Sequence, residues 1–181
     1  MANTDIVNSK KSQEIIEEKQ YDERTLQIDR VARVVKGGRR FRFRALVVVG
    51  DRHHRVGIGS AKGPDVTAAV SKAQNVAKKN FIQVITVKDT IPHETSAKVS
   101  GAKIILKPAS DGTGLIAGGV IRTILDVAGV KNILSKSLGS SNKTNVSYAV
   151  IEALKSLSPK SEWITTKVNQ TEKKTTAKES K

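Results

Sequence analysis

The alternation of apolar and polar residues predicts a β-rich first half of the chain. Residues 25–35, 40–50 and 55–59 are expected to form strands, and over residues 40–44 polar and apolar residues alternate with the period of two that sends successive side chains to opposite faces. We expect a tight turn over residues 51–54 to join the last two strands. Apolar residues then recur at helical spacing over residues 64–80, where a proline suits the first turn, so one helix should follow the three strands.

The second half has a different pattern, in which strands and helices are mixed. A glycine-rich stretch at residues 112–119 leads into an expected helix over 117–128, for which Gly129 is a suitable stop. Ser141 or Asn142 can cap a last helix. Strands are expected over residues 82–88, 93–99, 102–107 and 132–138.

These elements predict an α+β protein with two domains. We place a flexible N-terminal arm at residues 1–24, an RNA-binding domain at 25–88, a C-terminal α/β domain at 89–158 and a polar tail at 159–181. Hydrophobic residues make up 38% of the chain, which is enough for a core, although only 3% are aromatic. The core should therefore consist mainly of aliphatic side chains.

Composition excludes several classes of protein. The chain has no cysteine, so it has no disulfide, zinc–thiolate site or thiol nucleophile. Its longest apolar run is five residues, whereas a membrane-spanning helix needs about 20. The polar first twenty residues do not resemble a secretory signal. We therefore expect a cytoplasmic protein with no membrane partner.

Charge is concentrated in one short segment. The chain of 181 residues carries a formal net charge of +15, yet residues 1–29 contain more acids than bases. Such a localised excess predicts a polyanionic partner. Residues 30–44 contain no acid and seven bases, which we predict bind RNA phosphates: Arg30, Arg33, Lys36, Arg39, Arg40, Arg42 and Arg44.

The arginines of this segment alternate with aromatic residues. In a strand, Arg40, Arg42 and Arg44 would lie on one face, with Phe41 and Phe43 on the other. The two rings continue an apolar face through residues 45–49, so we favour packing in the core. Stacking on unpaired bases is the alternative for both rings. The opposite face is suited to phosphate.

The remaining candidates for RNA contact come from loops and the first helix. Gly37 and Gly38 would let the backbone approach RNA closely. A basic loop tip is expected around His53 and His54. The full set of further predicted contacts is Gly37, Gly38, Arg52, His53, His54, Arg55, Lys62, Lys72, Lys78 and Lys79.

No motif predicts catalysis. Residues 57–63 resemble a dinucleotide-binding turn but lack its glycine spacing, and we favour a close backbone approach instead. Residues 112–119 and 139–144 resemble phosphate-binding loops but lack the G-x-x-x-x-G-K-[ST] pattern. The adjacent His53 and His54 cannot easily face one metal together, and no nearby carboxylate or thiol completes a set with them. We expect no enzyme activity, cofactor, metal or small-molecule substrate.

Two longer stretches, however, resemble a known family. Residues 36–59 contain KGGR, FRFRALVVVGD and RVGIG in that order, and residues 107–142 contain KPASDGTGLIAGG followed by VAGVKNILSKSLGSSN. Both resemble the signatures of the bacterial-type small-subunit ribosomal protein S-five family. The resemblance covers residues 25–157.

The resemblance implies both a fold and a function. It implies an N-terminal domain similar to a double-stranded RNA-binding fold, with three strands and a helix, and a C-terminal two-layer α/β domain with a left-handed crossover. It implies a structural constituent of the small ribosomal subunit that binds rRNA, supports assembly and translational accuracy, and contacts ribosomal proteins S-four and S-eight near the entry of messenger RNA. The residues that match its S-four interface are Gly112, Gly114, Gly118 and Arg122.

The chain departs from the family at two positions and leaves two rival functions open. His54 and Ala61 stand where the family commonly has glycine, which puts the geometry of the turn and of the loop before the helix in doubt. A free-standing regulator that binds double-stranded RNA would explain the first half only. A nucleotide-dependent enzyme would need one of the glycine loops. The ribosome could be bacterial or organellar.

Overall fold

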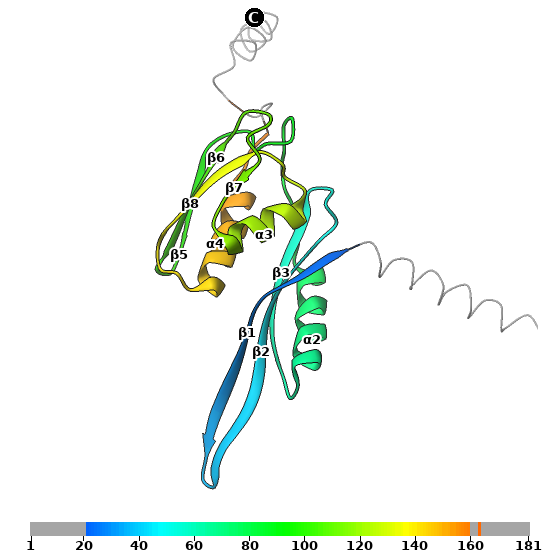
Figure 1. Ribbon diagram of the computed structural model, residues 1–181, viewed down its shortest axis with the longest axis vertical. Helices are drawn as coiled ribbons and strands as arrows, with labels where there is room; N and C mark the ends of the chain where they lie inside the picture. Colours follow the sequence, from blue (N-terminus) through cyan, green and yellow to red (C-terminus); the bar gives the residue numbers. More distant parts are fainter. Residues whose placement is uncertain (1–20, 160–162, 164–181) are drawn as a thin grey trace, which may run out of the picture.

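The first sheet is antiparallel and carries one helix. The computed structural model describes residues 21–159 and residue 163, and Figure 1 shows its two sheets. Strand order in the first sheet is β1-β2-β3-β4, and α2 covers one face of it. The elements are β1 (Asp22–Val35), β2 (Gly38–Gly50), β3 (Arg55–Gly63), α2 (Val66–Lys79) and β4 (Phe81–Gln83).

Small residues let α2 lie directly on the sheet. Ala69, Ala73 and Ala77 form its buried stripe and pack against the β2 face that carries Val47. A Cβ atom at Gly59 of β3 would collide with the carbonyl oxygen of Ala73. The glycines of residues 57–63 therefore serve the close approach of the helix to the strand.

The C-terminal domain has two layers. Its sheet has the order β5-β6-β8-β7, and α3 and α4 pack on one face of it. β7 and β8 run parallel and α3 connects them, so this connection is the expected crossover, whose hand stays a prediction. The elements are β5 (Thr95–Val99), β6 (Ala102–Pro108), β7 (Leu115–Ile116), α3 (Gly119–Ala128), β8 (Ile133–Gly139) and α4 (Lys143–Lys155).

One hydrophobic core joins the two domains. Leu46 and Val48 of β2 and Ile58 of β3 face away from α2 and pack with buried residues of α3, α4 and β6. This half of the first sheet is therefore buried on both faces, and residues 45–50 are all buried. The sequence did not reveal that both faces are covered, because a run of aliphatic residues fits a strand with either one or two covered faces.

Several predicted elements are confirmed, and others need correction. Asn142 caps α4, since its side chain accepts a hydrogen bond from the backbone N–H of Thr144. Gly129 ends α3 with a positive φ of 84°. The strand predicted over 82–88 is wrong beyond residue 83, and β4 belongs to the first sheet. The helix predicted from 117 begins at Gly119, because Leu115–Ile116 forms the short strand β7 instead.

The ends of the chain were predicted less well. β1 begins at Asp22, so residues 22–24 are strand and not part of an arm. The remainder of the predicted arm, residues 1–20, and most of the predicted tail lie outside the described residues. No helix of the described part of the chain has the length and apolar character needed to cross a membrane.

Candidate nucleic-acid interface

The basic segment forms a hairpin that projects beyond α2. β1 and β2 pair without a break from Gln27 opposite Leu46 to Val35 opposite Gly38. Figure 1 shows the two strands extending past the end of α2 and away from the C-terminal domain. Residues 36–42 are all exposed. The fold thus places most of the predicted phosphate ligands on a two-stranded arm that is open to solvent on both faces.

One face of the hairpin is basic. Arg33 and Arg40 are directly opposed across the two strands, and Arg42 follows on the same face. Together with Lys62 of β3, these arginines surround a groove of about 240 Å³ whose floor includes the apolar residues Val31 and Val35. Among the described residues, none of the four cations of the groove forms an ion pair with an acid. Their charges are available to a ligand.

Arg44 differs from the other arginines of the segment. Its guanidinium lies 2.6 Å from the carboxylate of Asp29, which is directly opposite on β1. The hydrogen bonds from Arg44 and Gln27 hold the pKa of Asp29 below its ordinary value. Arg44 therefore compensates an internal charge and is a weaker candidate for phosphate than its neighbours.

The opposite face of the hairpin carries the two phenylalanines, which behave differently. Phe43 packs on the core beneath α2, as predicted. Phe41 is 48% exposed, so its predicted place in the core is wrong. Its ring is covered on one side by the guanidinium of Arg30, whose Cζ lies 3.8 Å from the ring centroid. The hairpin extends beyond the end of α2, and no core is left there to receive the ring.

The hairpin tip is narrow and has little side-chain bulk. Lys36, Gly37, Gly38 and Arg39 are all exposed, and Gly38 has a φ of +139°, a region that non-glycine residues rarely adopt. A Cβ atom at Gly37 or Gly38 would meet nothing within 4 Å in this chain. The space beside both glycines is therefore open to an external molecule.

The loop over residues 51–54 lies at the other end of β2. A strand of 13 residues rises about 40 Å at about 3.3 Å per residue, so this loop and the hairpin tip are far apart. The backbone N–H groups of Arg52 and His54 donate to the carbonyl oxygens of Val127 and Ala128 in α3. Arg52 and His53 of the predicted basic loop tip are exposed, and the loop also docks through its backbone on the C-terminal domain, which the sequence did not indicate.

Local acids neutralise the arginines of this loop. Asp51 accepts from the backbone N–H groups of His53 and Arg55 and from the Arg55 side chain at 2.6 Å. Burial raises the pKa of Asp51, but these hydrogen bonds outweigh it and the pKa is lowered overall. His54 has a positive φ of 68°, so the turn does require the conformation that a glycine adopts more easily.

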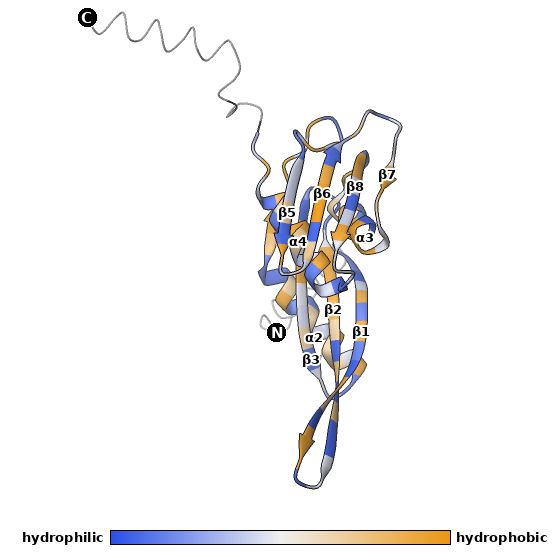
Figure 2. Cartoon of the chain, turned by 90° about the vertical axis from the view of Figure 1, so that its left-hand side faces the viewer, coloured by the Kyte–Doolittle hydropathy of each residue, from blue (hydrophilic) through white to orange (hydrophobic). Residues whose placement is uncertain are grey.

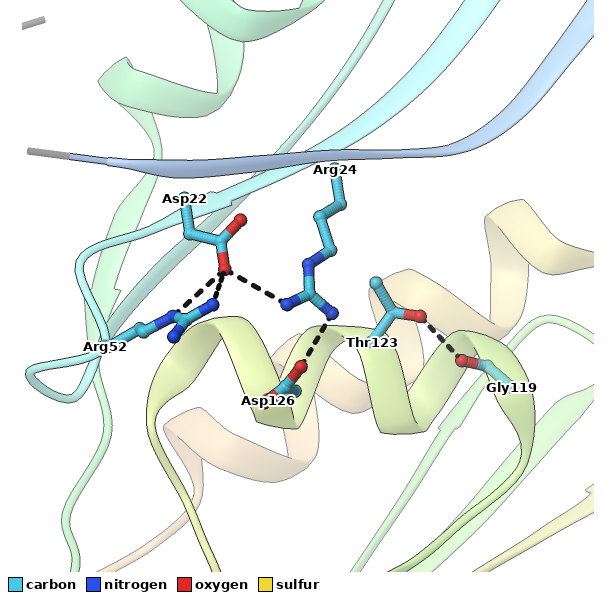
Figure 3. A network of polar contacts seen from close by, with 6 residues as sticks. All are labelled: Asp22, Arg24, Arg52, Gly119, Thr123 and Asp126. Carbon is cyan, nitrogen blue, oxygen red and sulfur yellow. Dashed lines mark hydrogen bonds and ion pairs between the residues drawn. The ribbon is translucent and has the colours of Figure 1, made fainter. Parts of the chain in front are cut away.

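A network of four charged side chains fastens the loop and β1 to α3, as Figure 3 shows. Asp22 accepts from Arg52 at 2.7 Å and from Arg24 at 3.2 Å, and Arg24 reaches Asp126 of α3 at 2.6 Å. Burial of the Asp22 carboxyl raises its pKa, yet the two arginines hold it below its ordinary value. Sequence reasoning missed Asp22, Arg24 and Asp126, since nothing in their spacing indicates that they meet.

The lysines of α2 are divided between solvent and an ion pair. Lys72 and Lys79 are exposed, as expected of a basic helix face. Lys78 lies 3.1 Å from the carboxylate of Glu23 and beside the ring of Tyr21. The charge of Lys78 is therefore paired with Glu23 at the start of β1. Nothing in the sequence indicated that these two residues meet.

Hydrogen bonds to the side chain of Asn132 fix the glycine loop of the C-terminal domain, residues 112–119. Gly112 and Gly114 both have positive φ, and the buried side chain of Asn132 accepts from the N–H of Gly114 and donates to Asp111, each at 3.0 Å. A Cβ atom at Gly112, Gly114 or Gly118 would meet nothing within 4 Å. Gly118 and Arg122 are exposed, so the four residues of the predicted protein interface all border solvent or open space.

The described residues contain no arrangement that would hold a metal ion. Within residues 21–159 and 163, no group of three or more His, Cys, Asp or Glu side chains converges. His93 Nε2 accepts a hydrogen bond from the backbone N–H of Ser158 at 3.1 Å, and its ring packs edge-on against Trp163, so His93 has a structural role. The site that the fold supports best is thus the basic hairpin.

Comparisons with known proteins identify the family of the chain. The family model "Ribosomal protein S5, N-terminal domain" matches residues 21–85, and "Ribosomal protein S5, C-terminal domain" matches residues 97–165. The Small ribosomal subunit protein uS5 of Thermus thermophilus is 51% identical over 145 residues, which are 80% of this chain and 90% of the relative. The proteins of that name from two strains of the species match equally well. The chain belongs to the ribosomal protein S5 family.

Proposed function

We propose that this protein is a structural constituent of the small ribosomal subunit, and that the hairpin of residues 27–46 binds small-subunit rRNA. The observation that carries the proposal is the groove of Arg33, Arg40, Arg42 and Lys62, which has four cations and no acid partner among the described residues. The prediction that the chain is not an enzyme agrees with its membership of a ribosomal protein family.

The binding mechanism follows from charge and shape. Each Arg or Lys that approaches a phosphate releases condensed counterions, so affinity for RNA should fall steeply with salt. The basic face would follow the backbone of a paired segment and read its A-form shape. At the tip, Gly37 and Gly38 would allow the protein backbone to come closer to the RNA than a side chain permits.

The C-terminal domain would contact protein neighbours. The open space at Gly112, Gly114 and Gly118, with Arg122 beside it, supports an interface with ribosomal protein S-four. Contacts with S-eight, a place near the entry of messenger RNA and an effect on translational accuracy rest on the family resemblance. The same family membership supports a cytoplasmic ribosome, because the relatives are bacterial.

Charge reversal in the hairpin tests the proposal. Changing both Arg40 and Arg42 to Glu should weaken binding to small-subunit rRNA by at least about 100-fold at 0.1 M salt, since two phosphate contacts become repulsions. The control reverses Lys173 and Lys174, which changes the net charge equally. Equal losses in a salt-controlled filter-binding assay would contradict a localised hairpin site.

Sedimentation tests the cellular role. The protein should travel with small subunits after a high-salt wash, whereas a free regulator of double-stranded RNA should remain at the top of the gradient. A thermal-shift screen with ATP, GTP and NAD addresses the nucleotide-dependent alternative, for which we expect no shift.

A further inference from the structure

The C-terminal sheet has an open face with a basic end. α3 and α4 cover one face only, and Figure 2 looks onto the other, where β5, β6 and β8 lie in front of the helices. Along β6 the buried residues alternate with Lys103, Ile105 and Lys107, which point to the open side. The register places Lys98 of β5 directly opposite Lys103 and places Lys136 of β8 opposite Ile105.

Three of the lysines on this face form an uncompensated cluster. Lys98 and Lys103 are a directly opposed cross-strand pair, and Lys136 is the diagonal neighbour of Lys103. All three are exposed, and none forms an ion pair within the described part of the chain. By contrast, Lys107 at the far end of the face is paired with Glu94 at 3.3 Å. Like charges in direct opposition destabilise a sheet, so the cluster opposes folding.

A hollow lies beside the cluster. It has a volume of about 500 Å³ at the end of the sheet where β5 turns into β6. Ser96 offers a hydroxyl group to the hollow, whereas a Cβ atom at Gly139 would collide with the carbonyl oxygen of Gly101, so the two glycines serve the turn itself. The lining includes Ser96, Lys98, Gly101, Lys103, Leu138 and Gly139.

The composition of this end favours RNA over a protein partner. Protein interfaces are enriched in Tyr, Trp and Arg at their centres and depleted in Lys. The basic end has three lysines, a serine, two glycines and the apolar residues Ala97 and Leu138, without an aromatic ring or an arginine. Lysine is a flexible point charge that commonly serves phosphate. We propose that Lys98, Lys103 and Lys136 form a second RNA-binding site, which takes a sugar–phosphate backbone at the hollow.

This site is separate from the hairpin in both sequence and structure. The hairpin belongs to the first sheet, and it projects away from the C-terminal domain (Figure 1). The second site would therefore give the protein contacts with two RNA segments, or with two parts of one folded RNA. Its existence does not depend on the hairpin binding RNA.

Neutralisation of the cluster tests the site. The full-length triple variant Lys98→Gln, Lys103→Gln, Lys136→Gln should bind in vitro transcribed small-subunit rRNA about 10- to 100-fold more weakly at 0.1 M salt. The slope of log affinity against log salt should become shallower by about 2 to 3. The control variant changes three exposed lysines elsewhere to Gln, namely Lys88, Lys131 and Lys155, and should leave the slope within about 1.

Two outcomes would overturn the proposal. One is an equal loss of RNA affinity in the cluster and control variants, because the loss would then follow from the lower net charge alone and not from a localised site. The other is wild-type affinity and slope in the cluster variant together with loss of a neighbouring protein from reconstituted subunits, which would assign the face to a protein partner. Thermal unfolding of both variants checks that they fold.

Directed cleavage separates this proposal from the hairpin proposal. Because the chain has no cysteine, one introduced cysteine can carry an iron chelate that cuts nearby RNA. A chelate at Ser100→Cys, in the exposed turn next to the hollow, should cut one set of rRNA nucleotides, and Val34→Cys on the hairpin should cut another. Cuts from Val34→Cys alone would overturn the second site and leave the hairpin site intact. Cuts from Ser100→Cys alone would overturn the hairpin site and leave the second site intact.

Discussion

Arginines lie in the first half of strand β2 and just beyond its other end, yet the two groups have different surroundings. At the hairpin end, Arg40 and Arg42 face a groove with no acid partner among the described residues. At the other end, Arg52 and Arg55 are held by Asp22 and Asp51 at 2.7 and 2.6 Å. The difference shows that the number of bases in a segment does not predict its role. What matters is whether the fold brings acids to them.

The docked end of β2 should be the more sensitive to substitution. Gly129→Ala should lower the free energy of unfolding by about 2 to 4 kcal/mol, because a Cβ atom there would collide with the carbonyl oxygen of Arg52 and the residue has a positive φ. Denaturant unfolding measures this. The control Gly119→Ala introduces a methyl group into open space in the first turn of α3 and should be neutral or slightly stabilising. Equal stabilities for the two variants would contradict the tight docking of the loop.

RNA binding, in contrast to stability, should be more sensitive to substitutions at the hairpin end of β2 than at the loop end. Neutralising Arg40 and Arg42 with Gln should reduce the salt slope of rRNA binding by about 2 and the affinity by about 10- to 100-fold at 0.1 M salt. The matched variant Arg52→Gln, Arg55→Gln removes the same charge and should change the slope by less than 1, since acids already neutralise both arginines. If the two double variants have the same slope, the distinction between the two ends is wrong.

The Asp22 network should make part of the stability depend on pH. The pKa of Asp22 is lowered in the folded state from its ordinary value of 3.8, so its stabilising effect is present above that value and is lost as the pH falls through the folded pKa. Asp22→Asn should cost about 1 to 2 kcal/mol at pH 7 and less at pH 3, because the carboxyl group of the unfolded chain, with its ordinary pKa of 3.8, is then mostly protonated. Unfolding at the two pH values measures this, and a cost that does not change with pH would contradict it.

The smallest effect is expected at the exposed lysine pair. Lys98→Gln should raise the free energy of unfolding by about 0.2 to 0.5 kcal/mol at low salt, because it removes a like charge directly opposite Lys103. The gain should disappear near 1 M salt, where such charges are screened. Lys131→Gln, which removes the partner of Asp89, should have the opposite sign. A loss of stability in Lys98→Gln would show that the pair does not oppose folding.

Local chemistry made many of the elements predictable. Local signals include the period of two over residues 40–44, the alanine stripe of α2, the cap at Asn142 and the stop at Gly129, and each acts within a few residues of chain. Such signals do not depend on the rest of the fold. The resemblance to the S5 family likewise rested on two long ordered stretches, and both family models match the chain.

The places where prediction failed share one cause. Phe41 was expected in the core because it continues the apolar face of residues 43–49, but α2 does not extend far enough to cover it. The loop of residues 51–54 was expected to be a basic loop tip, and its docking through backbone hydrogen bonds to the end of α3 was not foreseen. Neither outcome could be derived from the strand itself, since each depends on the length or position of a helix elsewhere.

The sequence by itself determined the strongly basic segment, the order of most helices and strands, the absence of cysteine chemistry and the family. Each of these is a property of composition or of neighbouring residues. Only the tertiary structure decided which bases are free, because Asp22, Glu23, Asp29 and Asp126 meet their cations over distances in the chain that carry no local signal. The physical reason is that an ion pair depends on separation in space, and strand pairing and domain docking bring together residues that are remote along the chain.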